Sequence, residues 1–156
     1  CTKEARIKSV VAGTTVRAVA EHHSCQAPFV WDPRRLVLKS IGTKIDGCGG
    51  YRCSLEVVNK LREEFSRIGS ANATVLSFLL ENPRLIPKEW KGKTVCFGGT
   101  VYQHLDLGHW SRRILLEGGY YVDCLFWFPE GKKWWGDERD LSLGFGDNNQ
   151  VLAVYR

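Results

Sequence analysis

The last part of the chain contains the two stretches that decide the fold, TVCFGGTVY at residues 94–102 and YYVDCLFWF at residues 120–128. Both are rich in β-branched and aromatic residues and are bounded by turn residues, a pattern that is typical of β-strands. Twelve of the eighteen aromatic residues lie within residues 94–156, more than the core of a small sheet needs. These residues are therefore predicted to form an aromatic-rich antiparallel β-meander or a small, partly open barrel.

Two segments before this sheet have the periodicity of amphipathic helices. In residues 54–69, apolar side chains recur at spacings of three and four, and Ser54 can cap the first turn. A second, shorter apolar segment covers residues 71–81, and Asn82-Pro83 should end it. We expect a helical hairpin whose joint apolar face packs on the sheet. The predicted fold class is therefore α+β.

The N-terminal third is the least regular part of the sequence. Residues 9–12, 14–19 and 36–41 are dominated by β-branched and aliphatic residues and predict strands, with prolines and glycines between and after them. Residues 18–21 could equally start a short helix. The chain therefore divides into three parts. These are a basic, irregular, β-containing part at residues 1–53, the helical hairpin with its linker at 54–93, and the aromatic-rich sheet at 94–156.

Composition and charge exclude some partners and permit others. The chain is 44% hydrophobic and 25% charged, as in ordinary globular proteins. No apolar run approaches the ~20 residues of a membrane-spanning helix, so we expect no membrane partner, and a cytoplasmic location is favoured. The net charge is +5, and residues 1–70 hold the whole excess, with twelve Lys and Arg against seven Asp and Glu. Such a surface can attract polyanions, although a solvated basic face is the simpler interpretation.

One segment has a distinctive motif. It consists of Leu85-Ile86-Pro87, then Glu89-Trp90-Lys91-Gly92-Lys93, then Gly99-Thr100 and Tyr102. With its flanks, the segment resembles a recurring C-terminal region of uncharacterised proteins from candidate-phylum bacteria, over roughly residues 71–136. The sequence departs from that pattern at Cys96 and Gly98. The resemblance implies a shared domain with an aromatic-rich tail, and it implies no activity.

Four residues of the first part form the best candidate metal site. His22 precedes Cys25 by three positions, and Cys48 and Cys53 flank a glycine-rich turn. Zinc prefers thiolate and imidazole ligands in a tetrahedron, and pairs of such ligands often come from tight loops. The four residues could hold a structural zinc ion, although their spacing is loose for known zinc motifs.

The cysteines also permit two simpler interpretations. Six cysteines is an even count, so Cys25–Cys48 or Cys48–Cys53 could be disulfides in a secreted protein. They could equally be free thiols that pack as small apolar groups. The free-thiol interpretation is the one expected for Cys96 and Cys124, which lie inside predicted strands.

A cysteine-dependent hydrolase is a less favoured alternative. Cys25 could pair with His104 or His109, with Asp106 or Asp123 orienting the imidazole. No local motif marks any of these cysteines as activated, and no phosphate-binding glycine loop or metalloprotease helix is present.

Tryptophans beside cations are the strongest candidates for a binding site. They are Trp134 and Trp135 next to Lys132 and Lys133, together with Trp110 before Arg112 and Arg113. Such groupings suit stacking on exposed bases with contacts to phosphates, or a groove for sugars or proline-rich peptides. Adjacent strand residues point to opposite faces, so at least one residue of the Trp134-Trp135 pair should be available for contact.

The sequence therefore predicts a non-enzymatic binding or accessory module. Its aromatic and basic sheet surface would contact nucleic acid such as RNA, or a protein partner in a larger assembly. The alternative is a purely structural subunit in which all of these aromatic side chains are buried.

Overall fold

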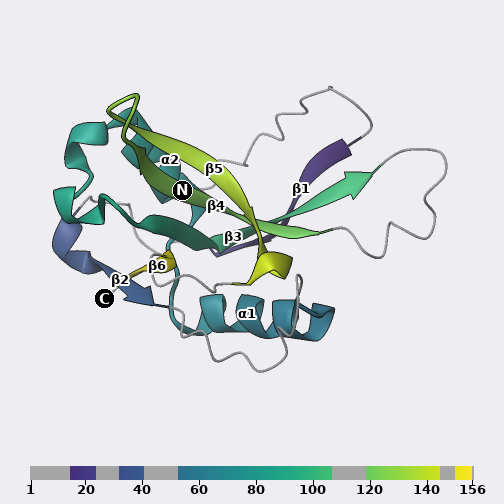
Figure 1. Ribbon diagram of the computed structural model, residues 1–156. Helices are drawn as coiled ribbons and strands as arrows, with labels where there is room; N and C mark the ends of the chain where they lie inside the picture. Colours follow the sequence, from purple (N-terminus) through teal and green to yellow (C-terminus); the bar gives the residue numbers. More distant parts are fainter. Residues whose placement is uncertain (1–14, 24–31, 41–52, 107–118, 145–149, 156) are drawn as a thin grey trace.

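The computed structural model describes residues 15–23, 32–40, 53–106, 119–144 and 150–155 (Figure 1). These residues form two α-helices and one open, mixed β-sheet, which confirms the predicted α+β class. The strands expected at residues 14–19 and 36–41 are present as β1 and β2, and the strand expected at residues 9–12 lies outside the described residues. None of the helices in these ranges is long and apolar enough to cross a membrane.

The sheet has six strands, in the order β2-β6-β3-β4-β5, and β1 pairs with the second half of β3. Their bounds are β1 Thr15–His22, β2 Leu36–Ser40, β3 Thr94–Asp106, β4 Tyr120–Phe128, β5 Lys133–Asp140 and β6 Gln150–Tyr155. The segment β3-β4-β5 is the predicted antiparallel meander.

The last strand departs from that meander, because β6 runs parallel to the start of β3 and lies between β3 and β2. Residues 151–154 are all buried. A continuous apolar run of this kind suits a strand that is covered on both faces, and this is the environment of a central position in the sheet.

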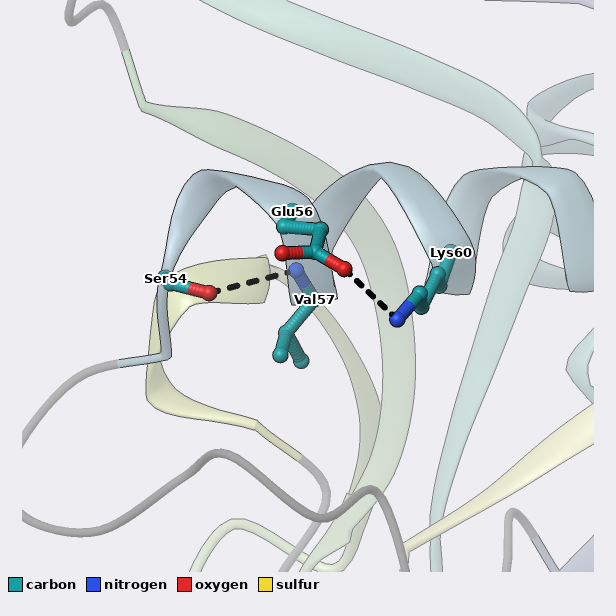
Figure 2. A network of polar contacts seen from close by, with 4 residues as sticks. All are labelled: Ser54, Glu56, Val57 and Lys60. Carbon is teal, nitrogen blue, oxygen red and sulfur yellow. Dashed lines mark hydrogen bonds and ion pairs between the residues drawn. The ribbon is translucent and has the colours of Figure 1, made fainter.

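Helix α1, Leu55–Arg67, begins where the sequence predicts and has the expected cap (Figure 2). The Ser54 hydroxyl accepts a hydrogen bond of 3.4 Å from the backbone N–H of Val57. One turn later, Glu56 and Lys60 form an exposed ion pair of 2.8 Å along the helix. The cap satisfies a backbone N–H that has no partner within the helix, and the ion pair links the first turn to the next one.

Helix α2, Ala73–Glu81, has a stronger cap than α1. The side-chain oxygen of Asn72 accepts from the N–H groups of Thr74 and Val75, and its amide donates to the carbonyl of His23 at 2.8 Å. Asn72 is buried, so the cap also ties the start of α2 to the end of β1.

The two helices cover opposite faces of the sheet, which corrects the predicted hairpin on one face (Figure 1). Helix α1 buries Val57, Val58, Leu61 and Phe65 in one core cluster, and α2 buries Val75, Leu76 and Leu79 in the other. Neighbouring strand residues divide between the clusters, with Cys96 and Leu152 on the α1 side and Val95 and Val151 on the α2 side. Because side chains alternate along a strand, the clusters lie on the two sides of the sheet.

The link between the helices passes from one face to the other at the level of the sheet. Ala71 donates its N–H to the carbonyl of Ala153 in β6 at 2.8 Å, and its carbonyl accepts from Gly99 in β3 at 2.9 Å. Gly69 accepts from Tyr155 at 3.1 Å. The link therefore occupies the place of a neighbouring strand along β3, between the part of β3 that pairs with β6 and the part that pairs with β1.

Glycines in β3 make room for this crossing. A Cβ on Gly99 would lie 2.4 Å from the carbonyl oxygen of Ser70, and a Cβ on Gly98 would lie 2.6 Å from the ring of Phe65. The close approach of backbone and ring requires residues without side chains.

Candidate functional site

The β4–β5 hairpin carries the predicted aromatic and basic residues. Its eight register pairs run without a break from Tyr121–Asp140 to Phe128–Lys133. Trp135 lies opposite Phe126, and Trp134 lies opposite Trp127. Directly opposed residues of an antiparallel pair share a face, so the hairpin has two distinct aromatic faces.

The face with Trp134 is packed against the α2 side of the core. Trp134 contacts the α2 cluster, and its ring meets that of Trp127 edge-to-face with centroids 5.4 Å apart. The ammonium of Lys91 lies 3.7 Å from the centre of the Trp127 ring. Two residues along β5, a Cβ on Gly136 would come within 2.9 Å of Leu80 in α2. Trp134 is therefore a packing residue, with a polar cover over its partner.

The opposite side, here called the Trp135 face, consists of Phe126, Phe128, Lys133, Trp135 and Asp137. This face lies on the same side of the sheet as α1. The α1 cluster ends at Cys124 in β4, and the next residue, Leu125, belongs to the α2 cluster. Trp135 is consequently 48% exposed and Phe128 is 40% exposed. The ammonium of Lys133 lies 4.6 Å from the centre of the Trp135 ring.

The expectation that Trp134 and Trp135 point to opposite faces is confirmed, and Trp135 is the exposed member of the pair. That it contacts a partner stays a prediction. Lys132 lies in the hairpin turn with a positive φ of 47° and is exposed. Trp110, Arg112 and Arg113 lie outside the described residues, so their part in the predicted surface stays a prediction.

The predicted zinc ligands have other partners where they are described. A hydrogen bond of 2.8 Å joins the Nδ1 of His22 and the hydroxyl of Thr100. Cys53 is disulfide-bonded, and in that state it has no thiolate to offer a metal. Cys25 and Cys48 lie outside the described residues, and within those residues no three potential ligands gather. The zinc site stays a prediction.

The catalytic cysteine hypothesis gains no support from the described cysteines. Contact with Cys96, together with burial, raises the pKa of the Cys124 thiol far above its usual range. A nucleophilic cysteine needs the opposite shift. Asp123 is described, whereas Cys25, His109 and the side chain of His104 are not.

Sequence reasoning missed a cavity of about 500 Å³ between the end of β1 and α1. It is lined by polar side chains, namely Glu21, His22, His23, Asn59, Arg62, Glu63 and Ser66. Arg62 pairs with Glu21, donates to Asn59 at 3.0 Å and lies over the ring of Tyr120 at 4.1 Å. Arg62 and Glu21 thus neutralise each other in the cavity lining, while Glu63 adds one exposed carboxylate. No spacing in the sequence could have joined residues 21–23 to the middle of a helix.

No protein-family model, curated protein or solved structure matches this chain.

Proposed function

We propose that this chain is a non-enzymatic binding module whose Trp135 face docks a protein partner. The observation that carries the proposal is the exposure of Trp135, 48%, on a face that also presents Phe126 and Phe128. Large aromatic side chains contribute most of the binding energy in protein interfaces when a partner covers them. Here the rings stand on an unbroken antiparallel ladder, so little side-chain or backbone order has to be gained on binding.

The charges around these rings favour protein over nucleic acid as the partner. The Trp135 face carries one cation, Lys133, and one anion, Asp137, and the Lys133 ammonium already lies over an aromatic ring. The next residue on the same side of β5, Arg139, donates to the carbonyl of Gly144 at 2.9 Å. Nucleic-acid surfaces need an excess of Lys and Arg along the path of the phosphates. A patch with aromatic residues inside and balanced charges at its edge is typical of protein interfaces.

The structural-subunit alternative required the aromatic side chains to be buried, and the exposure of Trp135 and Phe128 does not support it. The cysteine hydrolase requires an activated thiol, and none of the described cysteines supports that requirement.

The proposal is tested by capture with matched variants. The full chain, Trp135→Ala and Leu55→Ala are immobilised and exposed to an extract of cells that produce the chain. Leu55 is a fair control because it is 58% exposed on α1, away from the hairpin. A protein retained by the full chain and by Leu55→Ala, then purified and rebound, should bind Trp135→Ala roughly 30-fold more weakly, the effect of losing about 2 kcal/mol.

A second arm measures binding of a labelled 20-nucleotide single-stranded RNA at low salt. The proposal predicts no binding that depends on Trp135. RNA binding that Trp135→Ala abolishes would replace the protein partner by nucleic acid. Equal protein capture by all three chains would remove the Trp135 face from the account.

A further inference from the structure

Two cysteines meet inside the core, on neighbouring strands. Cys96 in β3 lies directly opposite Cys124 in β4, and their sulfur atoms are 2.9 Å apart. Both side chains are buried, at 0% and 2% exposure, and both belong to the α1 cluster. Nonbonded carbon atoms normally pack about 3.5–4.0 Å apart, and sulfur is larger than carbon, so the two thiols are pressed together more closely than packing alone requires.

Both cysteines are free thiols in the structure, as the sequence predicted, and their close contact points to a covalent bond that an oxidant can close. We propose that Cys96 and Cys124 form a disulfide between β3 and β4 when the chain folds in an oxidising compartment. Opposed residues of an antiparallel pair have Cα atoms about 4.5–5.5 Å apart, inside the ~4.4–6.8 Å range of disulfides. The sulfur atoms need to close by less than about 1 Å to reach bonding distance.

The bond forms by thiol–disulfide exchange with a disulfide oxidant such as glutathione disulfide. One cysteine thiolate attacks the oxidant, breaks its S–S bond and releases one glutathione thiolate, leaving a mixed disulfide. The second cysteine thiolate then attacks the protein sulfur of the mixed disulfide and releases the second glutathione. Two protons and two electrons pass from the cysteines to the oxidant, which leaves as two thiols.

Burial dictates when this exchange takes place. In the closed core no oxidant can reach either sulfur, and mutual contact with burial holds the Cys124 thiol in its protonated form by raising its pKa. The exchange therefore takes place during folding, before α1 packs on its side of the sheet and covers the two cysteines. Once formed, the buried bond resists reduction for the same reason.

Cys53 supports this chemistry independently, because it is already disulfide-bonded and belongs to the same cluster. Stable disulfides are typical of secreted and extracytoplasmic proteins. The proposal thus places folding in an oxidising compartment, in contrast to the cytoplasm favoured by the sequence. It does not depend on the Trp135 face, so either proposal can fail without the other.

The test is peptide mapping of the full chain after refolding with glutathione disulfide. Free thiols are alkylated, and the protein is cut with trypsin without reduction. Cleavage separates Cys96, in residues 94–112, from Cys124, in residues 114–132, unless a disulfide joins the two peptides. The proposal predicts one linked species of their combined mass, which reduction divides. Recovery of both peptides with alkylated cysteines would overturn it, whatever the state of the peptide at residues 53–60, which holds Cys53.

A second measurement isolates the effect on stability. The melting temperature of the oxidised chain minus that of the reduced chain contains the contributions of both the Cys53 bond and the proposed bond. In the double variant Cys96→Ala, Cys124→Ala, the same difference in melting temperature contains only the contribution of the Cys53 bond. The difference should be roughly 10 °C larger in the unsubstituted chain, the effect expected for closing a loop of this length. Equal differences in the two chains would contradict the proposal.

Discussion

Trp134 and Trp135 are adjacent in sequence and have opposite surroundings. Trp134 packs against the α2 cluster and the ring of Trp127, whereas Trp135 is about half exposed beside Phe128. Strand alternation sends the two rings to different faces, and the position of the helices decides which face is covered. Leu80 of α2 lies next to Gly136 in β5, so α2 covers its side of the hairpin. On the other side, the α1 cluster ends at Cys124 in β4. The aromatic excess thus divides into core and surface because the two helices extend over the hairpin to different degrees.

The largest effect should come from blocking the crossing that places the helices on opposite faces. A Cβ in Gly99→Ala would lie 2.4 Å from the backbone oxygen of Ser70, which cannot move without breaking the link between β3 and β6. We expect a loss of about 3 kcal/mol or more in the free energy of unfolding, measured by urea denaturation. Gly136→Ala is the control, because its one close contact, at 2.9 Å, would be with the flexible end of Leu80, and it should change stability by less than about 1 kcal/mol. Equal losses in the two variants would argue against the crossing.

The comparison between the tryptophans predicts an intermediate effect. Trp134→Ala removes a ring from the α2 cluster and should cost about 2–3 kcal/mol of unfolding free energy. Trp135→Ala removes an exposed ring and should cost less than about 1 kcal/mol. Urea denaturation of both variants measures the difference. A larger loss for Trp135→Ala would mean that the α1 side of the hairpin is the covered one.

The smallest effect concerns the exposed start of α1. The hydrogen bond and the charge of Lys60 lower the pKa of Glu56 below its ordinary value of 4.5. A carboxyl group with a lowered pKa stabilises the folded chain above that ordinary value, and this contribution is lost as the pH falls through the folded-state pKa. Glu56→Gln should therefore slightly reduce the urea midpoint at pH 7 and leave it unchanged well below the folded-state pKa. High salt should reduce the difference in urea midpoint between the two chains at pH 7, since the ion pair is fully exposed. A difference in urea midpoint that is larger in acid than at pH 7 would contradict the prediction.

Much of the local structure follows from the sequence. Apolar spacing and caps locate α1 and α2 within two residues at each end, and β-branched runs locate β3, β4 and β6. These features depend on neighbours in the chain, such as Ser54 on Val57, and such neighbours can be compared directly in the sequence.

The arrangement in space depends on contacts between distant residues. Whether α1 and α2 share a face is decided by hydrogen bonds from residues 69–71 to β3 and β6, which lie about 30 and 80 positions further along. The meeting of Cys96 with Cys124 depends on strand register, and the long connection between the strands leaves that register open in the sequence. The alternation of side chains along a strand is enough to predict that Trp134 and Trp135 lie on opposite faces. The positions of the two helices are needed to tell which of the two rings is covered.

Hydroxyl-radical footprinting of the full chain, alone and with its captured protein partner, tests the central claim most directly. In the free chain, Trp135 and Phe128 should be modified faster than Trp134. In the complex, modification of Trp135 and Phe128 should fall while that of Trp134 stays as it was. Unchanged modification of Trp135 in the complex would show that the partner binds elsewhere and would contradict the account.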